Sequence, residues 1–97
     1  MSIMIIVDAK LKDDKVEDAK KLFAELLPDT RGFEGCEGIT MILNQEDPAN
    51  MVLVEKWASK SHYEKYHHWR EETGSLNRIR ELLDGPPKRR FFEIVNE

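Results

Sequence analysis

The sequence has 97 residues, of which 40% are hydrophobic and 35% are charged, a composition typical of one globular domain with a well-solvated surface. Its 15 basic and 19 acidic side chains give a formal net charge of -4 without any basic block, which argues against binding to nucleic acid or to an anionic membrane. The longest apolar run, residues 3–7, is too short to span a bilayer and has no signal-peptide flanks. The single cysteine, Cys36, excludes an intrachain disulfide, which suits the reducing cytoplasm. We expect one cytoplasmic domain over residues 1–97.

The first third of the chain predicts a strand, a helix and a loop. Residues 2–11 form the strand, because apolar side chains recur there with a period of two. Asp14 and Glu17 form a capping box that opens an amphipathic helix, and Pro28 ends or kinks that helix. Two glycines within residues 31–35 predict a loop with unusual backbone angles.

The middle of the chain predicts a β-hairpin followed by a helix. Residues 36–45 and 51–58 form the two strands, and the proline and asparagine between them favour a turn. Ser61 and Glu64 form a second capping box, which opens a helix over about residues 62–72.

The end of the chain predicts a short helix and a last strand over residues 90–95. Glycine and two prolines at residues 85–87 stop the short helix. The resulting order β-α-β-β-α-α-β is the split βαβ arrangement of ferredoxin-like α+β folds. We therefore predict an antiparallel four-stranded sheet with its helices on one face.

Two predicted strands are apolar on both faces. Residues 3–7 and 51–54 are apolar at every position, although one face of such a sheet should be polar if it meets water. Because the helices cover only one face, the other face needs a cover from outside the chain. The simplest cover is a second copy of the same sheet, so we predict a homodimer that closes a dimeric α/β barrel.

The helix over residues 62–72 has an unusual inward face. On a helical wheel its polar residues gather on one side, and the opposite side contains no aliphatic residue. That inward side consists of His62, Tyr63, Tyr66, His67, Trp69 and Arg70. One interpretation is a pocket wall that stacks on a flat aromatic ligand and binds it through polar groups. The other is an aromatic core layer, with His62 and Arg70 at its rim.

If the face lines a pocket, its residues suit different roles. His67 is placed to act as a general acid or base near neutral pH. Arg70 suits an anionic enolate or phenolate oxygen. Tyr63, Tyr66, Trp69 and His62 would bind the substrate. Trp57, at the end of the preceding strand, is a core ring or the floor of the pocket.

Other candidate groups carry weaker signals. Cys36 is interpreted as a buried structural thiol, because no basic cluster surrounds it in the sequence. Residues 88–90 are three consecutive cations, which form a solvated start of a strand or attract an anionic ligand. Asp8 is interpreted as a polar group at a strand end or interface, with a catalytic carboxylate as the alternative. The chain has no nucleotide or metalloprotease motif, and its histidines diverge on the helix, so we expect no metal and no cofactor.

Short segments along almost the whole chain carry a family resemblance. They are residues 31–36 (RGFEGC), residues 47–48 (DP) and residues 54–57 (VEKW) with Ser59 and Tyr63. These segments resemble the antibiotic biosynthesis monooxygenase family. Two further segments, residues 69–74 (WREETG) and 86–91 (PPKRRF), are similar to a bacterial subgroup described as quinol monooxygenases.

The resemblance implies a dimeric α+β barrel with a cavity between helices and sheet in each protomer. It also implies oxidation of a small aromatic, quinol or polyketide-like substrate by O2 without metal or flavin, with the substrate's own carbanion reducing oxygen. Related barrels degrade haem and share an asparagine on the first strand, which this chain lacks, although His67 remains a conceivable haem ligand. A third interpretation is a barrel that only binds a small molecule or serves in assembly.

Overall fold

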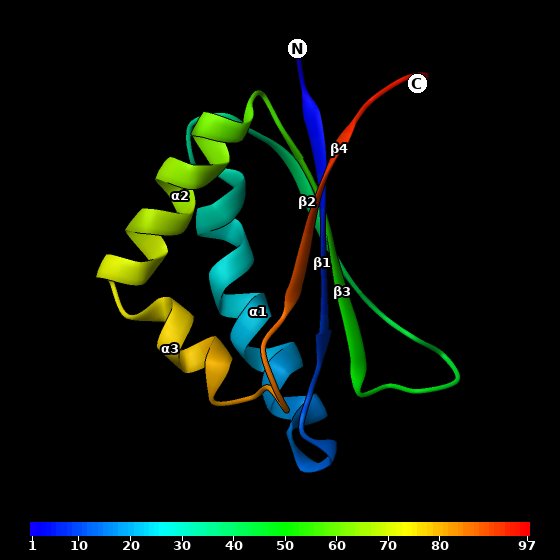
Figure 1. Cartoon of the computed structure of the whole chain (residues 1–97). Helices are drawn as coiled ribbons and strands as arrows, with labels where there is room; N and C mark the ends of the chain where they lie inside the picture. The colour runs from blue at the N-terminus through cyan, green and yellow to red at the C-terminus, as the bar shows by residue number, and fades with distance from the viewer.

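Four antiparallel strands and three helices build the protein. The computed structural model describes residues 1–97, and the strands are hydrogen-bonded in the order β2-β3-β1-β4. The strands are β1 (Ile3–Lys10), β2 (Cys36–Leu43), β3 (Asn50–Trp57) and β4 (Lys88–Glu93). The helices are α1 (Val16–Arg31), α2 (Lys60–Glu72) and α3 (Ser75–Arg80), preceded by a 3-10 turn at Asp13–Lys15. All three helices lie on one face of the sheet (Figure 1), which confirms the predicted ferredoxin-like α+β fold.

The inner face of the sheet carries the core. Ile5, Val7 and Ala9 alternate along β1 and are almost fully buried, as the period of two predicts. The apolar stripe of α1 covers them, with Phe23 and Leu27 in the same cluster as Ala9. Burial on this single face fixes the register of the strands, because a slip of one residue would turn every apolar side chain outward.

Both predicted capping boxes are wrong in position. Asp14 belongs to the 3-10 turn, and α1 begins after Lys15 with no side-chain cap. Ser59 rather than Ser61 caps α2, because its Oγ accepts the backbone N–H of His62 at 3.2 Å. The helix α1 also does not end at Pro28. It continues for three residues to its C-terminus, where a missing backbone donor removes only one hydrogen bond.

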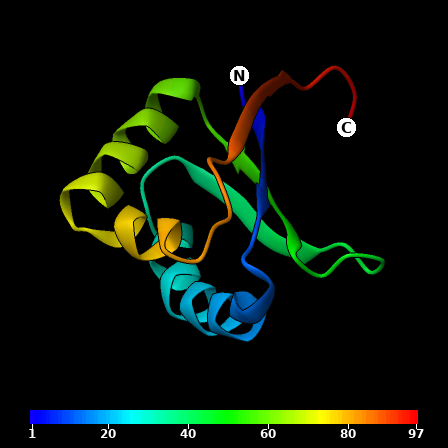
Figure 2. The ribbon, with the colours of Figure 1, turned by 60° about the horizontal axis from the view of Figure 1, so that its bottom comes forward.

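The centre of the outer face of the sheet carries apolar side chains, with Thr40 and Arg90 beside them, and has no cover from this chain. Ile6 and Val54 are register partners across β1 and β3, and both are only partly buried. Ile42 on β2 and Phe92 on β4 are 46% and 42% exposed on the same face. The β2–β3 hairpin extends beyond the layer of helices (Figure 2). All the helices lie on the opposite face of the sheet, so no helix folds back over this surface.

The loop between α1 and β2 fixes where α2 begins. Gly35 has a φ of 92°, as the sequence predicts for this loop, whereas Gly32 has an ordinary backbone. The carbonyl of Gly35 accepts the N–H of Ala58 at 2.8 Å, directly before α2. The ring of His62 packs against the α-carbon of Gly35 so closely that a Cβ there would overlap it. The glycine is therefore required both for its φ and for its small size.

We expect Gly35→Ala to lower the unfolding free energy by about 1–3 kcal/mol or more, because alanine is strained at this φ and collides with His62. Urea melts measure the change. Gly38→Ala is the matched control, since Gly38 has open space around it, and should stay within about 0.5 kcal/mol of the parent. A parent-like melt for Gly35→Ala would contradict the close packing of His62 on this loop.

Candidate functional site

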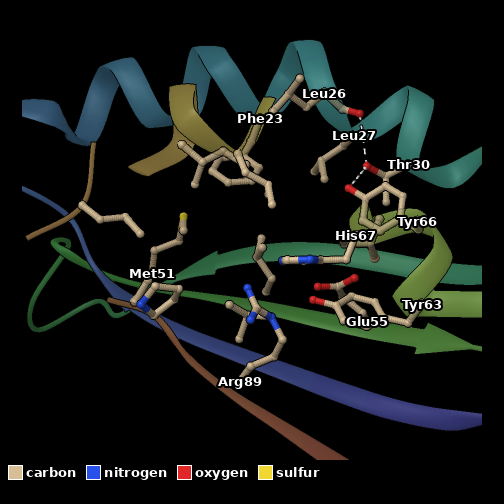
Figure 3. Close-up of a pocket in the computed structure, with 18 residues that line it drawn as sticks. Phe23, Leu26, Leu27, Thr30, Met51, Glu55, Tyr63, Tyr66, His67 and Arg89 are labelled. Atoms are coloured by element: carbon tan, nitrogen blue, oxygen red, sulfur yellow. Dashed lines mark hydrogen bonds between the residues drawn. The ribbon is translucent and has the colours of Figure 1, made fainter. Parts of the chain in front are cut away.

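A cavity of about 70 Å³ lies between the helices and the inner face of the sheet. Of the 18 residues that line it, 13 are hydrophobic. The lining side chains that carry a polar group are Thr30 on α1, Glu55 on β3, His67 on α2 and Arg89 on β4, together with Tyr63 and Tyr66 on α2, which are counted among the 13. Figure 3 shows the side chains of Glu55, His67 and Arg89 converging within this space. The chemistry of the site therefore comes from α2 and from two strands that are not neighbours in the sheet.

His67 lies at the mouth of the cavity. Together with Arg89 it also lines two surface hollows of about 400 and 330 Å³, so both side chains separate the interior from solvent. Burial lowers the pKa of the His67 imidazole, and the charges of Arg89 and Arg80 lower it further against the opposing effect of Glu71. The imidazole is therefore neutral near pH 7 and can accept a proton.

Arg89 is a cation without an ion-pair partner, although its guanidinium lies beside the hydroxyl of Tyr63. It lies opposite Val7 of β1 in the sheet, which directs its side chain to the inner face, while Lys88 and Arg90 on either side are exposed. Its Nε is buried and makes no hydrogen bond, and no ion pair involves its guanidinium. Of the three consecutive cations in the sequence, only Arg89 reaches the cavity. Its free donors suit an anionic oxygen.

Glu55 is a buried carboxylate that the sequence analysis missed. It is 2% exposed, and its Oε1 accepts the indole N–H of Trp57 at 3.0 Å. Burial raises the pKa of this carboxyl group, whereas the hydrogen bond from Trp57 and the charge of Arg89 oppose the rise. The signal was present in the alternation of β3, where Met51, Leu53, Glu55 and Trp57 share the inner face.

The two tyrosines of α2 line the cavity in different ways. Burial raises the pKa of the Tyr63 phenol far above its usual range, and the neighbouring charge of Glu55 adds to the effect. Tyr63 therefore stays protonated and can donate a hydrogen bond. The hydroxyl of Tyr66 shares a hydrogen bond of 2.8 Å with Thr30 on α1 (Figure 3), which fixes its ring against that helix.

Arg70 lies outside the cavity and has all the partners it needs. It is 2% exposed, and its guanidinium donates to the carbonyl of Leu26 at 2.8 Å and to Thr30 Oγ1 at 2.9 Å. Its Nε donates to the hydroxyl of Tyr66 at 3.0 Å. The structure thus joins Arg70 to α1 rather than to His67, and each of its three nitrogens already donates a hydrogen bond.

The rest of the inward face of α2 forms an aromatic layer. Phe33 contacts Tyr66 and Trp69 with ring centroids 5.3 and 5.4 Å apart, and Trp57 contacts Tyr66 at 5.0 Å. His62 shares a hydrogen bond of 2.6 Å with Ser59 through Nδ1. The two interpretations of this face therefore apply to different residues. Tyr63, Tyr66 and His67 line the cavity, whereas His62, Trp69, Arg70 and Trp57 do not.

The remaining candidates lie away from the cavity. Cys36 is half-buried rather than fully buried, and burial raises the pKa of its thiol, which disfavours the thiolate. Asp8 accepts a hydrogen bond from the side chain of Asn50 at 2.8 Å, as a polar group near the strand end. No three His, Cys, Asp or Glu side chains lie close enough together to hold a metal ion. None of the helices has the length and apolar character needed to cross a membrane.

The chain is a ferredoxin-like α+β domain, and the comparisons with known proteins agree with this fold. Residues 2–71 match the antibiotic biosynthesis monooxygenase family, so the chain belongs to that family. No curated protein matches the sequence.

Solved structures show the same fold at low identity. A conserved protein from Methanosarcina mazei Go1 superposes with a TM-score of 0.87 at 18% identity, covering 96% of this chain and 92% of its own. Rv0793 from Mycobacterium tuberculosis gives a TM-score of 0.86 at 16% identity, covering 100% and 98%. A crystal structure of an antibiotic biosynthesis monooxygenase gives 0.86 at 18% identity, covering 97% and 99%. At this identity the likeness establishes the architecture alone.

When unfolding is measured above neutral pH, we expect Glu55→Gln to have a higher urea midpoint than the parent. Glutamine removes a buried charge and keeps an oxygen that accepts the indole N–H of Trp57. The folded-state pKa of Glu55 lies above the ordinary value, so the parent loses unfolding free energy as pH rises through the window between the unfolded and folded pKa values. The gain should therefore shrink when both proteins are measured below the ordinary carboxyl pKa of 4.5.

Glu64→Gln is the control for this comparison, since Glu64 is exposed on α2 and should show no such pH-dependent gain. If Glu55→Gln is instead less stable than the parent at every pH, the ionised carboxylate is a favourable partner of Arg89. That result would contradict the assignment of a raised pKa.

Proposed function

We propose that this protein is a monooxygenase that uses O2 to oxidise a small hydroxyaromatic or quinol substrate without a bound cofactor. Membership of the antibiotic biosynthesis monooxygenase family supports a monooxygenase-type function. The observation that carries the finer proposal is the pairing of a neutral base, His67, with a cation that has no ion-pair partner, Arg89, at the mouth of an apolar cavity. Such a pair is suited to forming and stabilising a substrate anion.

The proposed reaction begins when the His67 imidazole accepts the proton of a substrate hydroxyl. Arg89 then stabilises the resulting oxyanion, whose charge is delocalised over the ring. The ring carbanion supplies the electrons that reduce O2, so no external reductant is required. For a hydroquinone the balance is hydroquinone + O2 giving hydroxyquinone + H2O: a ring C–H becomes C–OH with one oxygen atom, the diol is oxidised to the dione, and the other oxygen atom leaves as water.

The proposed substrate lies at the mouth rather than deep in the cavity. A cavity of about 150 Å³ is the size that accepts benzene, and the interior of about 70 Å³ is smaller than that. The hollow of about 400 Å³ outside it is lined by Tyr63 and Phe91, by His67 and Arg89, and by the polar residues Glu64, His68 and Glu71. An aromatic ring placed there can stack on those side chains with its hydroxyl between base and cation. Arg70 acts here as a positioning residue, because it holds the hydroxyl of Tyr66.

We also propose that the protein is a homodimer built on the outer face of the sheet. Ile6, Val54, Ile42 and Phe92 form an apolar surface that no element of the chain covers. A second copy of the same sheet has the same shape and polarity, so the two surfaces can bury one another around a twofold axis. The single cysteine favours a reducing compartment, and we place this dimer in the cytoplasm.

We expect His67→Gln to abolish O2 consumption with a naphthohydroquinone, measured at an oxygen electrode after subtraction of the uncatalysed rate. For the parent, kcat/KM should rise with pH through an inflection below 6.5, because the neutral imidazole is the active form and its pKa is lowered. Arg89→Gln should move that inflection upward, since the charge of Arg89 lowers the pKa of His67.

Two variants serve as controls for these rates. Lys65→Gln alters an exposed residue of α2 that lines neither the cavity nor the two hollows, and it should leave turnover unchanged. Arg89→Lys keeps the charge and should leave the inflection close to that of the parent. Tight binding of a naphthohydroquinone without any O2 consumption by the parent would contradict the enzymatic proposal and favour a barrel that only binds small molecules.

We expect light scattering to give the parent twice its chain mass of 11.4 kDa at micromolar concentration. Val54→Glu should yield monomers or insoluble protein, because it would bury an unpaired charge between the two sheets at a cost of several kcal/mol. Lys21→Glu, on the exposed side of α1, introduces the same side chain and should remain dimeric. A monomer mass for the parent would overturn the proposed dimer.

A further inference from the structure

We propose that the inner, apolar end of the cavity is a separate binding site for dioxygen. The identity of this gas rests on the proposed function, whereas the existence of a site for an apolar diatomic molecule rests on the cavity itself. The inference divides the site into a mouth for the aromatic ring and an interior for the oxidant.

The size of the interior selects its occupant. The whole cavity, with its polar end included, has a volume of about 70 Å³, which is several times the roughly 10–15 Å³ that one water molecule requires but below the roughly 150 Å³ of a cavity that takes benzene. A diatomic molecule fits this range and an aromatic ring does not. The interior therefore suits the smaller of the two substrates of the proposed reaction.

The lining of the inner end is apolar on every side. Ala9 and Met51 face one another across β1 and β3, and Phe23 and Leu27 of α1 lie above them. Leu83, which follows α3, lies between this end and the surface hollow of about 330 Å³. Water needs two to four polar partners to occupy a cavity, and these side chains provide none. A nonpolar gas needs only dispersion contacts, which a close-packed apolar wall supplies.

The polar groups gather at the opposite end of the same space. Glu55 lies four residues beyond Met51 on β3, roughly 13 Å along the strand. Figure 3 shows Glu55, Tyr63 and Tyr66 on one side of the cavity, with Met51 and Phe23 toward the other. Water that hydrates these polar groups can therefore stay at their end of the cavity, away from the apolar end.

The position of the mouth connects the two parts. His67 and Arg89 line the interior and also both surface hollows, so a ring bound between them lies over the cavity. One face of that ring meets solvent or the walls of the hollow, and the other meets the interior. Dioxygen held inside would thus reach the substrate anion from the side that is shielded from water.

Methyl NMR of the parent protein under O2 pressure tests this site directly, because dissolved O2 is paramagnetic and relaxes nearby protons. The methyl groups of Val7, Leu27 and Leu53 line the cavity and should relax several-fold faster than those of Leu11. Leu11 is fully buried but does not line the cavity, so it is the internal control for burial. Equal enhancement at Leu11 and at the cavity methyls would overturn the proposal.

A filled cavity provides the second arm. Leu27→Phe should remove the excess relaxation of the Val7 and Leu53 methyls and should raise KM for O2 several-fold. Binding of the naphthohydroquinone should stay the same, because the mouth is unaltered. Leu82→Phe is the matched control, since Leu82 is a buried member of the same core that does not line the cavity, and it should leave KM for O2 unchanged.

The two arms separate the failure of this inference from the failure of the proposed function. Excess relaxation at the cavity methyls without any turnover would retain the gas site and refute the monooxygenase. Turnover with uniform relaxation and an unchanged KM for O2 in Leu27→Phe would retain the enzyme and refute the inner site.

Discussion

The spacing between α1 and α2 depends on one buried guanidinium, that of Arg70. Its hydrogen bonds reach the Leu26 carbonyl and the Thr30 hydroxyl on α1, and they also reach Tyr66 on its own helix. Hydrogen bonds from a charged donor contribute about 1.5–3 kcal/mol each, and losing the donor would leave buried acceptors unpaired. This network holds α2 in the orientation that directs Tyr63 and His67 toward the sheet.

The cavity that results concentrates charge in a region of low dielectric. Glu55, His67 and Arg89 each change the ionisation of a neighbour, because little water screens them there. Arg89 opposes protonation of His67 and favours ionisation of Glu55, so one cation without an ion-pair partner influences both groups. The same cation is available to an anionic substrate. The group that changes the pKa values of His67 and Glu55 is therefore also the group that would stabilise the substrate anion in the proposed chemistry.

The two faces of the sheet have different roles, and the alternation of side chains along each strand provides both faces. On β3, Met51 and Glu55 face the helices and the cavity, whereas Val52 and Val54 face away from the chain. A dimer that covers the outer face would also stiffen the sheet beneath the cavity. The proposed oligomer and the proposed site are therefore joined through the backbone of β1 and β3.

The sequence by itself determined the strands, the helices and the direction in which their side chains point. The period of two along β1 identified Ile5, Val7 and Ala9 as core, and the helical wheel identified every half-buried or buried residue of α2 from His62 to Arg70. Both periodicities are local properties of the chain, so a single sequence reveals them.

Only the tertiary structure decided which of those side chains meet. A wheel shows that Arg70 and His67 both point inward, but it does not show that α1 supplies acceptors for Arg70 while the cavity opens at His67. Likewise, Arg89 reaches the site because β4 pairs with β1, and Glu55 is buried there because Trp57 and the helices enclose it. These outcomes depend on distances between elements that are remote in the sequence, and no local periodicity encodes such distances.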